Sequence, residues 1–394
     1  MLKEVVFLGG ARTPMGEYNG VLKDMTANEL GAIAAAEALR RSGVEPSSID
    51  HTVFGNALQT SRDAIYGARH VALRAGVPIE KPALTVNRLC GSGIQSIVSA
   101  AQMIQLDEAR TCLVGGMESM SQAPHVIWGA RSGFKLGQGK LEDWLMVSLT
   151  DGYCGFAMAQ TAENLARKYE ISREDQDAFA LRSQQLAAAA YEAGRLQEEI
   201  VPVEIKSRKG STMFAQDDHM RPETTMEILA KLPTAFSKDG FVTAGNASGI
   251  VDGASALTIA SEESASSMGL KPIGRIVSYA AAGVEPSEMG IGPVPATKAA
   301  LERAGLSLSD IDLIEVNEAF AAQYLAVERE LGLDRDRVNV NGGSIALGQP
   351  LGSSGTRLVL TLLHELRRRK ARYGLATACI GGGQGIAMIV EALN

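Results

Sequence analysis

The strongest constraint on the fold of this 394-residue chain is an internal repeat. Residues 38–57 (ALRRSGVEPSSIDHTVFGNA) align without a gap to residues 300–319 (ALERAGLSLSDIDLIEVNEA), and eight of the twenty positions are identical. Each copy reads as the end of a helix, a glycine stop, a turn that contains serine, and then a strand. The repeat therefore predicts two similar α/β units within one chain.

A second echo follows each copy. Leu84 to Asn87 runs into a turn and a helix with apolar residues at helical spacing, and Arg337 to Asn341 runs into a Gly-rich loop and a similar helix. A short apolar strand that ends in glycines follows each helix, at Thr111 to Gly116 and at Ala376 to Gly383. Strands that alternate with helices favour sheets covered by helices.

The segment between the repeats, about residues 121–246, has a different character. It is punctuated by Gly and Pro, contains Trp128 and Trp144, and includes a helix that opens at Ser172 with a capping-box-like start and that we expect to end near Gly194. We interpret this segment as an inserted loop domain, against the alternative of a structural excursion without a ligand role. The predicted units are residues 1–120 with 247–270, the insert 121–246, and residues 271–394.

The charge and cysteine content exclude several classes of protein. A formal net charge of −7 disfavours nonspecific nucleic-acid binding. No segment approaches 18 apolar residues, and the apolar run near the N-terminus is too short for a secretion signal, so we expect no membrane insertion and no export. Four cysteines without a C-x-x-C pair and five scattered histidines predict a reducing, cytoplasmic location and no metal site.

One basic cluster stands out on this acidic chain, and it lies inside the insert. Such a cluster is able to receive a phosphorylated ligand, although most runs of charge are solvated surfaces. Its members are Lys206, Arg208, Lys209, His219 and Arg221.

Cys90 lies between a predicted strand and a predicted helix, in the segment VNRLCGSG. A thiol at a helix N-terminus meets the positive end of the peptide dipoles, which favours the thiolate and creates a site for a carbonyl oxygen. The flanking Gly91 and Gly93 allow a ligand to approach the backbone closely. This segment by itself fits a nucleophile and a small buried core residue equally well.

Cys379 precedes the glycine-rich turn Gly381 to Gly385 at the end of a predicted strand. A second thiol there is able to donate or accept a proton once its neighbours tune its pKa. The turn superficially resembles a dinucleotide-binding loop. However, Ile386 to Val390 reads as another strand rather than a helix, so the Rossmann interpretation fails.

Taken in order along the chain, these motifs resemble the thiolase family, the acetyl-CoA C-acyltransferases, over essentially the whole length. The resemblance implies an α/β fold in which two similar βαβαβαββ halves form a five-layer α/β/α/β/α core with an inserted loop domain. It rests on the segments VNRLCGSG (86–93), GGMESMS (115–121), TAENLA (161–166), TAGNASG (243–249), VNEAF (316–320), NVNGG (339–343) and CIGGG (379–383).

The resemblance also implies a role for each matched residue. Cys90 would accept the acyl group from an acyl-CoA thioester, and Cys379 would exchange the proton of the second thiol or of the acetyl methyl carbon. The backbone N–H groups of Cys90 and Gly381 would bind the acyl oxygen, and Asn317 would hold a water near the thioester oxygen. The residues that match the CoA-binding region are Leu149, Ala157, Met158, Arg221, Phe236, Ala244 and Ser248. CoA and acyl-CoA are then substrates, no further cofactor is implied, and a dimer or tetramer is expected, with residues 133–137 in the loop where tetrameric members make contacts.

Two departures from the family pattern bear on activity. Gln349 stands where the family has the histidine that activates the nucleophilic cysteine, and an amide is unable to accept a proton at neutral pH. We therefore expect slow turnover in this chain, which is either an active-site variant made to trap a complex or a natural homologue without the histidine. Ala157 stands where acetoacetyl-CoA-forming members carry a histidine, so a longer or branched acyl chain is expected to fit.

Two other functions are weighed against an active thiolase. One is a thiolase-fold protein that only binds acyl-CoA, because Gln349 replaces the base. The other is a ketosynthase that acts on carrier-protein thioesters, which the motif after Cys379 and the basic cluster disfavour.

Overall fold

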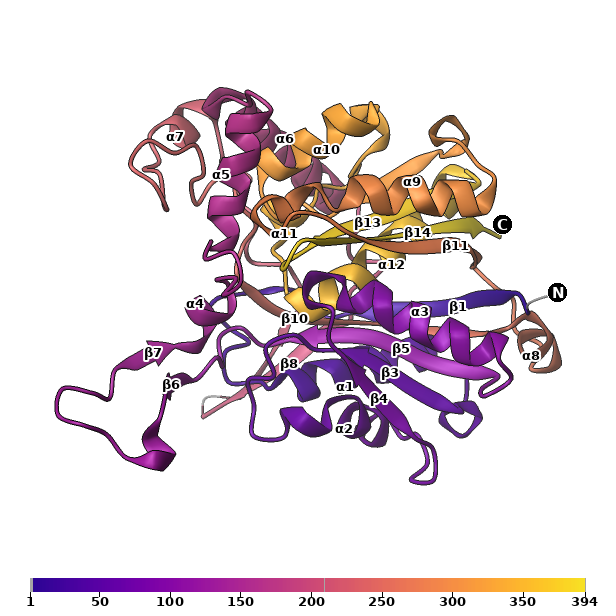
Figure 1. Ribbon diagram of the computed structural model, residues 1–394. Coiled ribbons are helices and arrows are strands. Elements are labelled where there is room, and N and C mark those ends of the chain that lie inside the picture. The colour runs from indigo at the N-terminus through magenta and orange to yellow at the C-terminus, as the bar shows by residue number, and fades with distance from the viewer. Residues whose placement is uncertain (1–2, 209, 394) are drawn as a thin grey trace.

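The computed structural model describes residues 3–208 and 210–393, and it contains two stacked sheets (Figure 1). One sheet has the order β1 (Val5–Arg12), β10 (Val251–Ser261), β5 (Thr111–Glu118), β3 (His51–Gly55) and β4 (Ala83–Val86), with the short β2 (Gly16–Glu17) beside β10. The other has the order β11 (Gly274–Gly283), β14 (Gln384–Ala392), β13 (Tyr373–Ile380) and β12 (Leu313–Val316). Hydrogen bonds join these two sheets where β1 pairs with β11 at two positions. By hydrogen bonding they are therefore one ten-stranded sheet, which folds over so that its two parts are stacked.

Helices fill the layers between and outside the sheets. Figure 1 shows α3 (Ser92–Gln105) and α12 (Leu351–Arg369) between the two sheets, where they pack on each other and on strands of both. The helices α1 (Ala27–Ser42), α2 (Gly67–Arg74) and α8 (Glu262–Ser267) lie on the N-terminal side, and α9 (Pro293–Ala304) and α10 (Ala321–Leu331) cover the other side. The predicted five-layer arrangement is therefore confirmed.

The first repeat has the same local structure in both halves. After α1, Gly43 adopts a left-handed backbone (φ 70°), and the short helix η1 (Pro46–Ser48) leads into β3. After α9, Gly305 adopts the same conformation (φ 64°), and η6 (Leu308–Asp310) leads into β12. Glycine takes this conformation without a steric cost, which explains why it ends both helices.

The two halves differ at the second echo. Leu84 to Asn87 overlaps strand β4, whereas Arg337 to Asn341 forms only the end of η7 (Arg335–Arg337) and isolated bridges. Asn339 has a positive φ of 47°, and its side chain both accepts from the backbone N–H of Val316 (2.8 Å) and donates to the backbone oxygen of Val316 (2.9 Å). A side chain thus supplies the hydrogen bonds that a strand would otherwise make.

The insert spreads over both halves instead of forming one separate body. Its first part is an arm, β6 (His125–Ile127), η4 (Ala130–Ser132) and β7 (Leu141–Asp143), which projects from the molecule in Figure 1 and leads into α4 (Trp144–Ser148). Next, α5 (Met158–Lys168) and α6 (Arg173–Glu192) pack against α10, and the Ser172 capping box at the start of α6 is confirmed. The hairpin β8 (Val203–Ser207) and β9 (Gly210–Phe214) packs on the N-terminal core through Val203, and α7 (Met226–Ala230) follows.

The remaining short elements are η2 (Ala64–Tyr66), η3 (Leu89–Gly91), η5 (Pro286–Ile291) and α11 (Ser344–Leu347). In the described part of the chain, no helix has both the length and the hydropathy needed to cross a membrane.

Candidate active site

Cys90 lies in the tight turn η3 that joins β4 to α3. Leu89 has a positive φ of 46°, and Ser92 closes the turn because its Oγ accepts from the N–H of Arg88 (2.8 Å) and donates to the carbonyl of Leu89 (2.7 Å). A Cβ on Gly91 would lie 2.5 Å from a side-chain carbon of Ile380, so only glycine lets this turn approach the end of β13. The predicted turn between a strand and a helix is therefore present, and it lies against the end of β13, where Cys379 is located.

Cys379 is fully buried near the end of β13, and residues 381–383 form the hairpin turn to β14. Gly382 and Gly383 have positive φ angles of 78° and 79°, which glycine adopts without strain. The prediction that a strand follows the glycines is confirmed.

The structure brings both thiols and three of the predicted partners into one cluster. The backbone N–H of Gly381 and the side chain of Gln349 both interact with the Cys90 thiol and favour its ionised form. Cys90 and the side chain of Asn317 are in turn neighbours of the Cys379 thiol. Five residues predicted from the sequence, Cys90, Cys379, Asn317, Gln349 and Gly381, therefore lie together.

The Cys90 thiol is not activated at rest, contrary to the expectation from its helix N-terminus. Burial raises the pKa of Cys90 to about 11, and the negative charge of Glu118 adds to the increase. The N–H groups of Gly381 and Cys90 and the amide of Gln349 act in the opposite direction but do not overcome burial. Burial and the nearby Cys90 also raise the pKa of the Cys379 thiol.

Asn317 is fully buried, and its side-chain amide faces the Cys379 thiol. Its Oδ1 accepts from the Oγ of Ser344 (2.9 Å), whereas its Nδ2 makes no hydrogen bond of ordinary geometry within the described residues. The same amide lies close enough to Cys379 to lower the pKa of that thiol, although burial outweighs this effect. A buried amide nitrogen whose neighbour is a thiol, a weak acceptor, fits a group that holds a water or a substrate oxygen.

Gln349 is buried and is held from two directions. Its backbone N–H donates to the carbonyl of Gly249 (2.9 Å), and its side-chain Oε1 accepts from the Oγ of Ser248 (3.0 Å). Because Ser248 occupies the amide oxygen, the amide nitrogen is left to donate toward Cys90.

Apolar side chains surround the two thiols. Cys90 packs with Leu58, Leu145, Leu149 and Leu351, and Cys379 packs with Met158 and Phe320 among others. Leu149 and Met158 are adjacent, because the N–H of Met158 donates to the carbonyl of Leu149 (2.9 Å). Ala157, the residue before Met158, begins α5 at this place.

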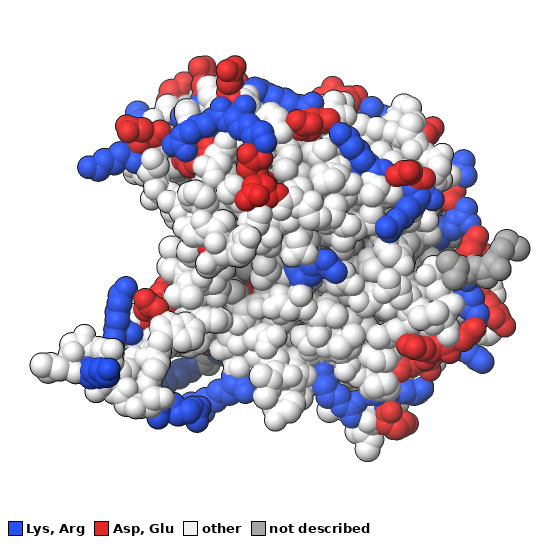
Figure 2. Space-filling view, viewed as in Figure 1, with Lys and Arg blue, Asp and Glu red and all other residues white. Residues whose placement is uncertain are grey.

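Three residues assigned to CoA lie at the surface. Phe236 is 42% exposed, Ala244 is exposed, and the side chain of Arg221 is 56% exposed. The face of the molecule shown in Figure 2 is hollowed between the projecting arm and the helices above it, and the surface of that hollow is largely uncharged.

The basic cluster does not form a single group. Lys206 and Arg208 are exposed on the β8–β9 hairpin, where Lys206 pairs with Glu204 (3.7 Å), while Lys209 lies outside the described residues. His219 and Arg221 instead share the carboxylate of Glu17, at 2.8 Å and 3.0 Å. The apolar residues of the hairpin pack on the N-terminal core. The basic residues of the hairpin therefore contact other groups than His219 and Arg221 do, although they are close to these two in sequence.

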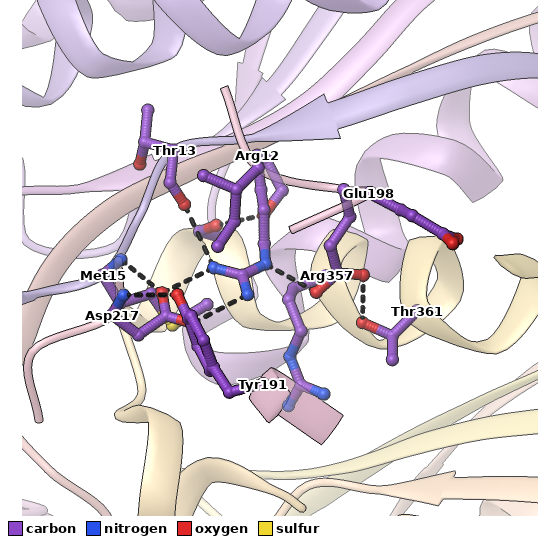
Figure 3. A network of polar contacts seen from close by, with 12 residues as sticks. Arg12, Thr13, Met15, Tyr191, Glu198, Asp217, Arg357 and Thr361 are labelled. Atoms are coloured by element: carbon purple, nitrogen blue, oxygen red, sulfur yellow. Dashed lines mark hydrogen bonds and ion pairs between the residues drawn. The ribbon is translucent and has the colours of Figure 1, made fainter. Parts of the chain in front are cut away.

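A buried ion pair anchors the loop that carries His219 and Arg221. Figure 3 shows Arg12 bound by Asp217, at 2.7 Å and 2.8 Å, and Arg12 also donates to Glu199 (2.7 Å). Buried ionic groups are tolerated when they are paired and hydrogen-bonded, and each of the three guanidinium nitrogens of Arg12 donates to a carboxylate.

Sequence reasoning assigned no role to two buried carboxylates near the site, Glu118 and Glu318. Both lie within motifs that carry the family resemblance. The sequence feature that could have identified them is an acidic residue in an otherwise apolar or glycine-rich segment at the end of a strand, because such a residue is rarely buried without a specific role.

Among residues 3–208 and 210–393, no group of three or more His, Cys, Asp or Glu side chains is arranged to hold a metal ion.

Comparison with known proteins agrees with this geometry. Residues 5–263 match the model of the thiolase N-terminal domain, and residues 270–392 match that of the thiolase C-terminal domain. The chain belongs to the thiolase family. It is 56% identical to human mitochondrial 3-ketoacyl-CoA thiolase over 393 residues, which is 100% of this chain and 99% of the relative. It is 50% identical to an acetyl-CoA acetyltransferase of Syntrophomonas wolfei, with 100% of both chains covered.

Solved thiolase structures have the same fold. The crystal structure of the human mitochondrial 3-ketoacyl-CoA thiolase has a TM-score of 0.98 at 55% identity and covers 100% of this chain and 99% of that one. The same human protein in complex with CoA has a TM-score of 0.97 and covers 100% and 98%. The predicted thiolase fold is confirmed.

Proposed function

We propose that this thiolase transfers acyl groups between CoA and Cys90, and so cleaves a 3-oxoacyl-CoA with CoA or joins two acyl-CoA molecules in the reverse Claisen condensation. The observation that carries the proposal is the cluster of Cys90, Cys379, Gly381 and Asn317. It unites a nucleophile, a second thiol for proton transfer, and backbone N–H groups beside the nucleophile, to which the proposal assigns the binding of the acyl oxygen. The names of the relatives, including the CoA complex of the human enzyme, support CoA and acyl-CoA as substrates, with no further cofactor.

The condensation divides into two steps. The sulfur of Cys90 bonds to the thioester carbonyl carbon of an acyl-CoA, the bond from that carbon to the CoA sulfur breaks, and CoA leaves with a proton. Cys379, after its own thiol has lost its proton to solvent, then removes a proton from the methyl carbon of acetyl-CoA as the thiolate. The carbanion attacks the acyl carbon on Cys90, the bond from that carbon to sulfur breaks with its electron pair left on Cys90, and Cys90 takes up the proton held by Cys379. Thiolysis follows the same steps in reverse.

Gln349 makes this chain slow in our proposal. The attacking sulfur must lose its proton, burial raises the pKa of Cys90 to about 11, and an amide is unable to take that proton. The amide still donates a hydrogen bond toward the sulfur and so retains part of the expected geometry. A chain that binds acyl-CoA without turnover is the alternative that this substitution favours.

Mass spectrometry of the intact protein distinguishes slow acyl transfer from acyl-CoA binding without turnover. After mixing with acetyl-CoA we expect Cys90 to gain one acetyl group, and we expect added CoA to remove it. The other half-exposed cysteine, Cys154, serves as the internal control and is expected to remain unlabelled. Acylation without release indicates a trapped half-reaction, and no acylation of Cys90 contradicts the proposed transfer.

The acyl group is proposed to be longer or more branched than acetoacetyl. Ala157 supplies a methyl group where acetoacetyl-CoA-forming members have an imidazole, and its neighbours Leu149 and Met158 are apolar. We expect Cys90 to be acylated faster by C6 to C10 acyl-CoA than by C4, and Ala157→His to reduce that preference by about 10-fold. A series of acyl lengths with no preference beyond C4 contradicts this assignment.

Assembly into a dimer or tetramer is proposed as well. The arm exposes large apolar side chains that a monomer would leave in water, among them Trp128 (57%), Phe134 (45%) and Leu136 (107%). Residues 133–137, expected to make tetramer contacts, lie at this arm. A cytoplasmic location stays a prediction, and the name of the human relative places that protein in mitochondria.

A further inference from the structure

The segment that carries Gln349, residues 343–352, is fixed at both ends by buried carboxylates. Glu318 lies at its start and Glu118 at its end, and both have no exposed surface. Glu118 comes from the end of β5, in the N-terminal half, and Glu318 follows β12 in the C-terminal half. We call residues 343–352 the Gln349 segment.

Glu118 collects four hydrogen bonds, and one of them comes from the Gln349 segment. The N–H of Gly352, in the first turn of α12, donates to Oε2 (2.9 Å). The other three donors are the side chain of Asn56 (2.7 Å) and the N–H groups of Ala57 (3.0 Å) and Leu58 (3.0 Å). Leu58 packs in the apolar group around Cys90, so one carboxylate ties the wall beside the nucleophile to the end of the Gln349 segment.

Glu318 makes a similar set of contacts at the other end. The N–H of Ile345 donates to its Oε2 (3.2 Å), and the Oγ of Ser183 donates to the same oxygen (2.7 Å) while accepting from the N–H of Gly343 (3.1 Å). Asn339 donates to Oε1 (2.8 Å). A Cβ on Gly343 would lie between 2.2 and 2.4 Å from the atoms of this carboxylate, so the chain passes directly over it.

Both anchor sites need a carboxylate and are not satisfied by an amide. A carboxylate accepts on both oxygens, whereas the NH2 of a glutamine would face N–H donors and leave them unpaired in the interior. Hydrogen bonds to an ionised group are also stronger than neutral ones. Burial raises the pKa of Glu118 to about 7 and also raises the pKa of Glu318, whereas the converging donors act in the opposite direction and favour the ionised form of each carboxyl group.

Between the two anchors, residue 349 is buried and has three contacts among the described residues. Its backbone N–H donates to the carbonyl of Gly249, and its side chain interacts with Ser248 and with the Cys90 thiol. We propose that Glu118 and Glu318 are positioning residues that clamp the Gln349 segment, so that the side chain at position 349 is held against Cys90. This inference depends on the proposed function in one respect, namely that residue 349 takes part in acyl transfer.

Hydrogen exchange of the unliganded protein tests the clamp without any turnover. In Glu118→Gln one acceptor oxygen becomes an NH2 group, so either the bonds from Ala57 and Gly352 or the bond from Leu58 is lost, and faster exchange at the amides that lose their acceptor is expected from the contact alone. The clamp predicts in addition that the amides of Gly348 and Gln349, which Glu118 does not touch, exchange at least about 10-fold faster. Asp50→Asn is the matched control, because Asp50 accepts two backbone N–H bonds, from Arg110 and Thr111, at the opposite end of β5.

A double-mutant cycle connects the clamp to the chemistry. Gln349→His is expected to increase the acylation rate, and this increase is expected to be at least about 10-fold smaller when Glu118→Gln is also present. In the Asp50→Asn background the increase is expected to be unchanged. The Kd for CoA is expected to stay within about 2-fold in all of these variants. Glu318→Gln is expected to behave as Glu118→Gln does, and it replaces that variant if Glu118→Gln fails to fold.

Unchanged exchange at Gly348 and Gln349 in both variants overturns the proposal, as does a Gln349→His gain that is the same in every background. If Gln349→His has no effect in the otherwise unaltered chain, the proposed function fails, and the exchange measurement still decides the clamp.

Discussion

Gln349→His is expected to raise the rate of thiolysis by about 10²- to 10⁴-fold, the range typical of a positioned general base. The side chain at 349 is buried, and its amide faces the Cys90 thiol. An imidazole at this position is able to take the thiol proton, which the amide does not. Ser248 already binds the Gln349 side chain, and its hydroxyl both donates and accepts, so it is able to orient the ring in either tautomer.

The pH dependence provides an independent check on this variant. With Gln349, acylation of Cys90 requires the free thiolate, so the rate should rise about tenfold per pH unit from pH 6 to 9, because the pKa of the thiol is raised to about 11. With histidine, the rate should level off once the imidazole is neutral, above its ordinary pKa of about 6.5.

Gln349→Asn is the matched control, since it retains an amide and adds no base. Stopped-flow measurement of thiolysis with a 3-oxoacyl-CoA gives both the gain and the pH profile. If Gln349→His is no faster than Gln349→Asn, position 349 is not the position of the general base.

Cys379→Ala is expected to lower condensation and thiolysis by about 10²- to 10⁴-fold while leaving the acylation of Cys90 by acyl-CoA within a few-fold. The two thiols are proposed to act in different steps, because Cys90 forms the acyl-enzyme and Cys379 transfers the proton of the second substrate. The raised pKa of the Cys379 thiol fits a group that is protonated at rest and that donates during thiolysis.

Cys112→Ala controls for the loss of a buried thiol, because Cys112 is fully buried on β5 and burial raises its pKa as well. It is expected to leave both half-reactions intact. Equal loss of acylation and condensation in Cys379→Ala would mean that this residue supports the structure of the site and not a separate proton transfer.

The local elements of this protein could be predicted from its sequence because their signals are short-range. A glycine in the left-handed conformation ends α1 and α9 alike, and Ser172 caps α6 through bonds to its own first turn. The turn at Cys90 and the hairpin after Cys379 likewise depend on glycines next to each thiol. The resemblance to the thiolase family then identified which of these elements belong to one site.

Other features depend on residues far apart in the chain. The helix N-terminus at Cys90 predicts a stabilised thiolate, but burial and the charge of Glu118, 28 positions away, reverse the shift. Lys206 on the β8–β9 hairpin pairs with Glu204, whereas His219 and Arg221, close to it in sequence, are held by Glu17, because the hairpin packs on its own part of the N-terminal core.

The sequence by itself thus determined the duplicated architecture, the two thiols and the absence of a histidine at position 349. Only the tertiary structure decided that Glu118 and Glu318 fix the two ends of the Gln349 segment, and that the Cys90 thiol remains protonated at rest. The physical reason is range: dihedral preferences and caps act within a few residues, whereas desolvation and buried carboxylates act through space on whatever the fold places beside them.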